Sequence, residues 1–351
     1  MFGYSNPVVQ EDMMLMAKTP SVWHKLNNKT VLVAGATGML ATYITYFLCY
    51  IHKECSVNVR VVALCRTRSK ADALFSDFYS EPWFKLVLQD ICEPIQCLGR
   101  IDFIFHLAGN ASPYYIKNDP VGIVKSNLIG TYNILELARD KEPEKIVFAS
   151  TREVYGKNEE VEILTEEDFG SVNPLEDRAC YPESKRAAET MFRSYSLQYG
   201  INFNSVRIAH SYGPGMRLAN DGRVMADLMN NVINGEDIVL KSEGTAERAF
   251  IYITDAVLAM FAVLFSGENG KAYNIANETE PIAIRDLASL LVTFRKDKQL
   301  KVVFDIPKTK SSAYTNYKRS GLNTSAVEHL SWKPVVKLEE GVGRTIKSFL
   351  K

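Results

Sequence analysis

The sequence predicts an α/β protein, with a doubly wound parallel sheet followed by a smaller C-terminal α/β domain. The first observation is a strand that turns directly into a helix between residues 30 and 51, through a glycine-rich junction. The second is the alternation of apolar strands with helical stretches as far as about residue 207. This alternation favours a parallel sheet with helices on both faces. Beyond residue 207 the predicted elements become shorter, which indicates a second domain.

The junction lies between the short strand Val31–Ala34 and the apolar helix Tyr43–Ile51, and it reads Gly35-Ala-Thr37-Gly38-Met39-Leu40-Ala41. A helix that begins directly after a strand leaves its first amide groups unpaired, and the positive end of its dipole faces outward. A pyrophosphate can bind there when the turn carries no bulky side chains, as Gly35 and Gly38 ensure. The pattern therefore predicts a dinucleotide site, although other tight strand–helix turns share it.

The other elements follow in regular order along the chain. The predicted strands are Val57–Leu64, Phe84–Val87, Phe103–Leu107, Lys145–Ser150 and Asn204–Ile208, and the predicted helices are Val8–Leu26, Val121–Arg139 and Tyr181 to about Tyr199. Loops are expected around 220–222, 235–237 and 307–321. We expect an N-terminal extension at 1–28, a dinucleotide-binding domain at 29–207 with a return near 248–256, and a substrate-binding domain at 208–351.

Composition and charge narrow the class of protein. Lys+Arg and Asp+Glu both number 41, so nothing in the charge points to nucleic acid or to an anionic membrane surface. The longest apolar stretch, Tyr43–Ile51, is too short to span a bilayer, and the first residues do not read as a secretory signal. The six cysteines include no C-x-x-C pair, so we expect neither a metal site nor disulfides. These features favour a cytoplasmic protein with reduced thiols.

Tyr181-Pro-Glu-Ser-Lys185 is the second informative motif, at the start of a predicted helix. Residues four apart share a helix face, so the phenol and the ammonium lie close together. A neighbouring cation favours the ionised phenol, and lowering its pKa by about three units would take about 4 kcal/mol. Lys185 and a cationic nicotinamide could supply that, which would make Tyr181 a base for a hydroxyl whose carbon loses a hydride. The same spacing also occurs by chance on many helices.

A third motif, Ser150-Thr151-Arg152-Glu153, follows the predicted strand that ends at Ser150. The carboxyl edge of an open α/β sheet is where such folds bind their ligands. The hydroxyl of Thr151 could therefore hydrogen-bond the reacting oxygen. With the glycine-rich turn and the Tyr181 motif, it forms a constellation that predicts one catalytic site.

Taken together, these motifs resemble those of the extended short-chain dehydrogenases/reductases, in the nucleotide-sugar epimerase/dehydratase/decarboxylase group, which have a Rossmann-type fold. The resemblance runs from Thr30 to the C-terminal helix, through HLAGNASP (106–113), STREVYG (150–156), YPESK (181–185), YGP (212–214), RAFIYITD (248–255) and WKP…LEEG (332–341). Within the group, two stretches are most similar to UDP-glucuronate decarboxylases, RACYPESKRAAETM (178–191) and YGPGMRLANDGRV (212–224).

The resemblance implies a role for each matching residue. Three match the catalytic triad, Thr151, Tyr181 and Lys185, and Glu153 matches a glutamate that acts as a base or supports one. Residues implied in dinucleotide binding are Gly35, Thr37, Gly38, Met39, Leu40, Arg66, Asp90, Ile91, Leu107 and Ala108, together with Tyr181 and Lys185. Residues implied in substrate binding are Arg152, His210, Arg217, Arg223 and Arg248. Glu153 and Arg248 could instead form a structural ion pair.

The chain departs from the group at two of these positions. Arg152 stands where decarboxylases usually carry serine and 4,6-dehydratases carry the aspartate they use as an acid, so it argues against dehydration. Its side chain could hold an anionic group of the sugar or point into solvent. His210 replaces a substrate-contacting asparagine and could bind substrate or pack in the core. His106 lies inside an apolar strand, which favours a position in the core over a catalytic role.

The resemblance implies NAD as the cofactor, but the second strand leaves NADP open. NAD sites usually place an acidic residue at the end of that strand, to hold the ribose 2′-hydroxyl. Here the strand is followed by Cys65-Arg66-Thr67-Arg68, without an acid. An arginine at this place suits a 2′-phosphate or stacks on adenine. Asp90 matches the group's contact to adenine.

The resemblance further implies an enzyme that oxidises a nucleotide-sugar at C4, with decarboxylation of a UDP-hexuronate favoured over 4-epimerisation. A third reading is a dinucleotide-binding protein without chemistry, against which the retained Thr151, Tyr181 and Lys185 argue. A homodimer is also implied, formed through the helices at 121–139 and 181–199.

Overall fold

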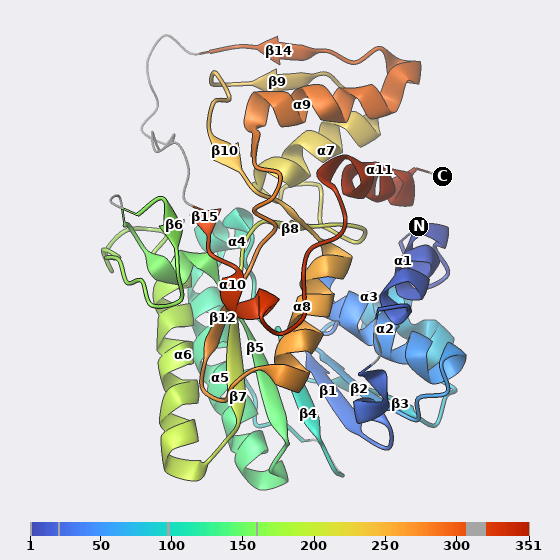
Figure 1. Cartoon of the computed structure of the whole chain (residues 1–351), viewed down its shortest axis with the longest axis vertical. Coiled ribbons are helices and arrows are strands. Elements are labelled where there is room, and N and C mark those ends of the chain that lie inside the picture. The colour runs from blue at the N-terminus through green and yellow to red at the C-terminus, as the bar shows by residue number, and fades with distance from the viewer. Residues whose placement is uncertain (1, 20–21, 97–98, 159–160, 307–320, 351) are drawn as a thin grey trace.

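The computed structural model of the chain describes residues 2–19, 22–96, 99–158, 161–306 and 321–350. Its centre is a seven-stranded, all-parallel sheet in the order β12-β7-β5-β4-β1-β2-β3, with helices on both faces (Figure 1). The other sheets of the described residues have two strands each. The fold is therefore the Rossmann-type doubly wound α/β fold that the sequence predicts.

The central strands are β1 (Thr30–Ala34), β2 (Arg60–Cys65), β3 (Phe84–Leu88), β4 (Phe103–His106), β5 (Lys145–Thr151), β7 (Phe203–Ile208) and β12 (Ala272–Ile275). The chain runs outward from β1 to β3 and then crosses to β4, on the other side of β1. In register, Ala34 lies beside Leu64 of β2 and His106 of β4, so these three strands end level. Ligands of such folds bind in the crevice at this reversal of strand order.

Successive residues of β1 pack into two separate hydrophobic cores, because side chains alternate between the two faces of a strand. Val31 and Val33 face a large core that contains residues of α2 (Met39–Glu54) and α8 (Ile253–Ser266). Leu32 and Ala34 face a second core, with residues of α5 (Pro120–Lys141) and α6 (Cys180–Tyr199). The two helix layers sandwich the sheet and hold its carboxyl ends in place.

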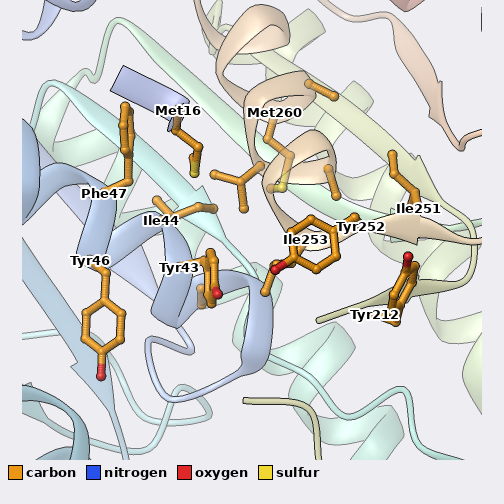
Figure 2. Close-up of a cluster of buried hydrophobic side chains, with 14 of the residues drawn as sticks. Met16, Tyr43, Ile44, Tyr46, Phe47, Tyr212, Ile251, Tyr252, Ile253 and Met260 are labelled. Atoms are coloured by element: carbon orange, nitrogen blue, oxygen red, sulfur yellow. The ribbon is translucent and has the colours of Figure 1, made fainter. Parts of the chain in front are cut away.

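The N-terminal stretch packs on the large core. It forms α1 (Pro7–Ala17) and the 3₁₀ helix η1 (Trp23–Leu26), rather than the single helix predicted over Val8–Leu26. The helix ends three residues before Pro20, and a proline cannot continue a helix interior. Met16 of α1, Phe47 of α2 and Met260 of α8 are all buried in one cluster (Figure 2).

The remaining elements are short. They are α3 (Arg68–Phe75), η2 (Ser76–Phe78), α4 (Pro113–Asn118), η3 (Arg152–Tyr155), β6 (Ile163–Leu164), β8 (Ser211–Tyr212), α7 (Val224–Asn234), β9 (Ile238–Leu240), β10 (Glu247–Arg248), β11 (Ile251–Tyr252), β13 (Ile282–Ala283), α9 (Ile284–Val292), η4 (Thr293–Lys298), β14 (Val302–Phe304), β15 (Gly321–Leu322), α10 (Ser325–Glu328) and α11 (Leu338–Phe349). Of the loop predicted at 307–321, residues 307–320 lie outside the described residues.

The strand by which the chain returns to the central sheet is β12. The stretch near 248–256, where a return was expected, instead contains β11, which pairs with β8 in a separate two-stranded sheet. An apolar run of this length does not reveal its partner strand, because pairing is a long-range choice. The division into domains near residue 207 stays a prediction.

Candidate active site

A cavity of ≈ 560 Å³ lies where the central strands end. Its walls come from the turn after β1, the segment after β4, the end of β5, the first turns of α6, and three segments beyond β7. Lining residues that the sequence analysis named are Thr37, Gly38, Met39, Leu40, Leu107, Thr151, Arg152, Glu153, Tyr181, Lys185, His210, Arg217, Arg223 and Arg248. The catalytic and substrate-binding residues inferred from the sequence therefore meet in one cavity.

The glycine-rich turn fits a bound pyrophosphate. Gly35 has a φ of +81°, and a methyl group on it would lie 2.7 Å from the backbone of Ala108, so the turn requires glycine. Gly38 is the N-cap of α2 and offers no side chain to its first amide groups. These groups have no intrahelical partner, and Gly38, Met39 and Leu40 line the cavity. The residues present suit the phosphates of a dinucleotide.

The residues inferred for the adenosine end lie outside this cavity. Arg66 is exposed beyond β2, and Asp90 accepts a hydrogen bond from the Cys92 amide at 2.9 Å. Ile91 is buried, and its side chain packs against Gly130 of α5. Arg68 pairs with Asp72, lies over the Tyr79 ring and does not line the cavity.

Lys70 lines the cavity and was missed by the sequence analysis. It is the third basic residue after β2, and that clustering is the signal that could have found it. Asn110, Ser112, Tyr115 and Asp221 also line the cavity without having been named. The first two lie in the HLAGNASP motif, which carried the resemblance but no assigned role.

Tyr181 and Thr151 are brought together by the packing of α6 on β5. A hydrogen bond between their side chains lowers the pKa of Tyr181, but burial raises it more strongly, to well above its ordinary value. The sequence predicted a lowered pKa for Tyr181, caused by Lys185 together with a cationic nicotinamide. It could not see that Tyr181 is only 5% exposed, and burial disfavours a phenolate.

Lys185 is buried behind the tyrosine. Its ammonium donates a hydrogen bond to the carbonyl of Ala149 at 2.7 Å and lies 4.5 Å from the centre of the Phe148 ring. Burial lowers the pKa of Lys185 to about 7, while the carboxylate of Glu189, one turn further along α6, opposes this. The lysine can therefore exchange a proton near neutral pH.

Glu153 is held by an arginine that the sequence analysis did not consider. Arg178 Nη2 donates to both carboxylate oxygens of Glu153, at 2.9 and 3.0 Å. Such a charge-assisted pair orients the carboxylate at the cavity wall. The partner lies 25 residues away in the sequence, just before α6, so no local pattern predicts it.

Arg152, His210 and Arg248 line the cavity, and both arginines act on the charge of His210. Burial, followed by the two arginines, lowers the pKa of His210 to about 3, so the imidazole is neutral at physiological pH. His210 has a φ of +46°, the left-handed region that asparagine and histidine tolerate better than most residues. Two guanidinium groups beside a neutral ring give this part of the cavity a positive potential. It therefore suits an anionic group.

Arg217 adds further positive charge to the wall, whereas Arg223 is part of an ion pair. The Arg217 guanidinium lies 5.0 Å from the ring centre of Tyr114 and 5.1 Å from that of Tyr115. Arg223 pairs with the buried Asp221 through an Nη2–Oδ2 contact of 3.0 Å. These partners fix both guanidinium groups without removing them from the cavity.

Among the described residues, no group of three or more His, Cys, Asp or Glu side chains is placed to hold a metal ion. The five cysteines in the described ranges are free thiols. His106 is fully buried, with Nε2 3.1 Å from Thr131 Oγ1, and is a core residue as expected. No helix in the described part of the chain combines the length and apolarity needed to cross a bilayer.

Comparisons with known proteins place this site in a family. The model of the NAD dependent epimerase/dehydratase family matches residues 31–276. UDP-glucuronic acid decarboxylase 6 of Arabidopsis thaliana is 33% identical over 90% of this chain and 87% of its own length. UDP-glucuronic acid decarboxylase 1 of Xenopus tropicalis is 31% identical over 93% of this chain and 73% of its own.

Solved structures support the same fold. UDP-glucose 4-epimerase of Thermotoga maritima superimposes with a TM-score of 0.76 at 22% identity, over 91% of this chain and 98% of that chain. UDP-glucuronic acid 4-epimerase of Bacillus cereus gives a TM-score of 0.73 at 22% identity, with the same two coverages. The family model covers more than half of the chain, and the two decarboxylases are more than 30% identical to it over most of its length. The chain is a member of the NAD-dependent epimerase/dehydratase family.

Proposed function

We propose that this protein decarboxylates a UDP-hexuronate through transient oxidation of the sugar at C4. The observation that carries the proposal is one cavity that holds both the Thr151–Tyr181–Lys185 group and the Arg152–Arg248 pair. The first suits oxidation of a hydroxyl, and the second suits a carboxylate nearby. The curated relatives that match 90% of the chain are named UDP-glucuronic acid decarboxylases, which supports the substrate class.

The proposed cofactor is NAD, with NADP as the alternative, and when bound it accepts a hydride from the sugar carbon and returns it. The turn after β1 would hold its pyrophosphate through Gly38 and the first amides of α2. Lys185 and Leu107 would lie along the rest of it, since both line the same cavity. Solved relatives in complex with NAD support this choice.

In the proposed reaction Tyr181 passes its own proton to the neutral form of Lys185, whose pKa is about 7, and takes the proton of the C4 hydroxyl. Thr151 hydrogen-bonds the same oxygen. The C4 ketone makes the C6 carboxylate a β-keto acid, so the C5–C6 bond breaks and its electron pair remains on the sugar as an enolate. CO2 leaves, and a proton from water then adds at C5. Tyr181 finally returns a proton to the C4 oxygen and recovers its own from Lys185. Glu153, whose carboxylate is oriented by Arg178, contacts the sugar near C5 and C6 and positions it.

The experiment that tests the proposal is incubation of the purified protein with UDP-glucuronate, UDP-galacturonate, UDP-glucose and UDP-N-acetylglucosamine. Product masses are then read by mass spectrometry. Loss of CO2 from a UDP-hexuronate is the expected result. Conversion of a neutral UDP-hexose without change of mass, with UDP-hexuronates ignored, would replace decarboxylation with 4-epimerisation, because the same three catalytic residues serve both reactions.

We further propose a cytoplasmic homodimer. Exposed apolar side chains on the paired helices α5 and α6 support the interface: Val121, Ile129, Tyr132 and Leu197. The balanced charge of the chain supports a small-molecule substrate rather than nucleic acid as its ligand.

A further inference from the structure

The N-terminal segment reaches the wall of the cavity through one side chain. The ring of Phe2 lies against Gly215, so closely that a methyl group on this glycine would be 2.4 Å from Phe2 Cζ. Gly215 lines the cavity, and its φ of +81° already favours glycine. Gly215 therefore contacts the ring of Phe2 and also lines the cavity.

The turn that contains Gly215 packs against two separate segments of the chain. A methyl group on Gly213 would lie 2.4 Å from Cγ2 of Ile253, the first residue of α8. Ile253 and Phe2 therefore both pack against the turn at 213–215. Met216 and Arg217 follow directly and line the cavity, and Arg217 lies over the rings of Tyr114 and Tyr115. A shift of the turn would move this guanidinium.

The segment that carries Phe2 is itself firmly anchored. Asp12 of α1 is 1% exposed, and its carboxylate accepts hydrogen bonds from the hydroxyls of Tyr43 and Tyr252, both at 2.8 Å. Its other oxygen accepts from Arg344 of α11, at 2.7 and 2.9 Å. Figure 2 shows Tyr43 and Tyr252 on neighbouring elements of one buried cluster. Asn6 also donates to the carbonyl of Ser348 in α11, at 3.1 Å.

Phe2 is also fixed laterally. Its ring lies 6.1 Å from that of Tyr46 in α2, and Tyr4 packs edge-on against the same ring at 5.4 Å. The first residues of the chain are thus joined to the helix whose N-terminus lines the cavity. A buried carboxylate, an aromatic cluster and a glycine contact together connect α1, α2, α11 and the 213–217 turn.

We propose that the N-terminal segment is a positioning element of the active site, in which Phe2 holds the 213–217 turn and thereby sets the affinity for a nucleoside diphosphate. The ligand class follows from the wall that the turn supports, since Arg217 offers a cation to a diphosphate and Tyr115 offers a ring to a base. The proposal rests on the proposed nucleotide-sugar site for its ligand, but not for the contact between Phe2 and the turn.

The test compares Phe2→Ala, Phe2→Tyr and the control Met14→Ala, whose side chain on α1 is 42% exposed. Calorimetry with UDP is expected to show about tenfold weaker binding for Phe2→Ala, with recovery in Phe2→Tyr, because the tyrosine ring keeps the contact with Gly215. Met14→Ala should bind UDP as the parent protein does. The retained dinucleotide and kcat should stay unchanged in all three, while KM for the nucleotide-sugar rises only in Phe2→Ala.

A second measurement needs no ligand. Hydrogen exchange of the amides in residues 213–217 is expected to become faster in Phe2→Ala and to stay slow in Phe2→Tyr and Met14→Ala. Unchanged exchange and unchanged UDP affinity in Phe2→Ala would overturn the proposal, as would equal loss of dinucleotide and UDP binding. If the parent protein bound no UDP, the nucleotide-sugar assignment would fail, and the exchange measurement would still decide the role of Phe2.

Discussion

Tyr181 is a phenol whose own surroundings keep it neutral. Burial raises its pKa more than Thr151 and the nearby arginines lower it. Lys185 is desolvated too, and its pKa falls to about 7. In the proposed mechanism, Lys185 in its neutral form is the group that accepts the proton that Tyr181 has to lose.

Replacement of Tyr181 by phenylalanine removes the proton acceptor while it keeps the buried ring. We expect the fold and the bound dinucleotide to be preserved and turnover to fall by about 10²–10⁴-fold, the usual contribution of a general base. Single-turnover kinetics and the absorbance of retained dinucleotide measure the two effects. Near-normal turnover in this variant would refute the assignment of Tyr181.

Arg152 is predicted to bind the carboxylate of the sugar. In Arg152→Ser, affinity for a UDP-hexuronate should fall by about 1.5–3 kcal/mol, the scale of a charged hydrogen bond, while affinity for UDP-glucose stays constant. Arg60→Ser is the control, because Arg60 is exposed at the amino end of β2, at the opposite edge of the sheet. Equal losses for the charged and the neutral sugar would show that Arg152 does not read the carboxylate.

Arg66 separates NAD from NADP. If its guanidinium binds a 2′-phosphate, the denatured protein should release NADP, and Arg66→Ala should weaken NADP binding selectively. If NAD is released, which is the expectation from the family, Arg66→Ala should leave its affinity nearly unchanged. Chromatography of the released dinucleotide decides between the two.

At the scale of elements, the sequence predicted type and order well. The strands and the long helices α5 and α6 have strong local signals, since apolar residues recur with the right period within each. The N-terminal helix was drawn too long because Met13 to Met16 and Trp23 to Leu26 are all apolar or amphipathic in one stretch. The function of Asp12 had no local signal, because its partners lie in α2, at the end of β11 and in α11.

Asp12 is expected to stabilise the docking of α1. Its replacement by alanine leaves Arg344 without its buried partner, so the free energy of unfolding should fall by about 3–5 kcal/mol. Tyr43→Phe removes one hydrogen bond to the same carboxylate and should cost about 1 kcal/mol. Urea denaturation measures both, and similar losses in the two variants would contradict the central role of the carboxylate.

At the scale of the whole molecule, the cavity is built from segments more than 200 residues apart in the sequence, from Thr37 to Phe250. The sheet aligns the ends of β1, β4 and β5, and the segments beyond β7 close the cavity from the other side. Figure 1 shows the short elements β8, β10 and α7 above the carboxyl ends of these strands. The large hydrophobic core, which includes residues of α2, α8 and α11, holds these elements there.

The exposed face of α5 and α6 leads to a prediction about assembly. Tyr132 of α5 is 48% exposed, and a charge there should be buried without a partner in a dimer formed by these helices. Tyr132→Glu is therefore expected to be monomeric by light scattering at micromolar concentration, while Val335→Glu, at an exposed site between α10 and α11, remains dimeric. A monomeric parent protein would contradict the proposed interface.

The sequence alone determined what depends on neighbours along the chain. The glycine-rich turn, the strand–helix alternation and the Tyr181–Lys185 spacing are local patterns, and each follows from backbone geometry. Most of the inferred site residues therefore meet in the cavity. Gly35 and Ala108, which lie against each other, do not line it, and Arg66, Asp90 and Ile91 at the adenosine end lie outside it.

The tertiary structure decided what depends on partners far away in the sequence. It paired Glu153 with Arg178 and Asp12 with Arg344, brought β12 rather than residues 250–253 into the central sheet, and placed Phe2 against Gly215. It also buried the Tyr181 phenol, which raises its pKa. Burial arises only when distant segments pack together, so neither a long-range ion pair nor a desolvated charge leaves a periodic signal in the sequence.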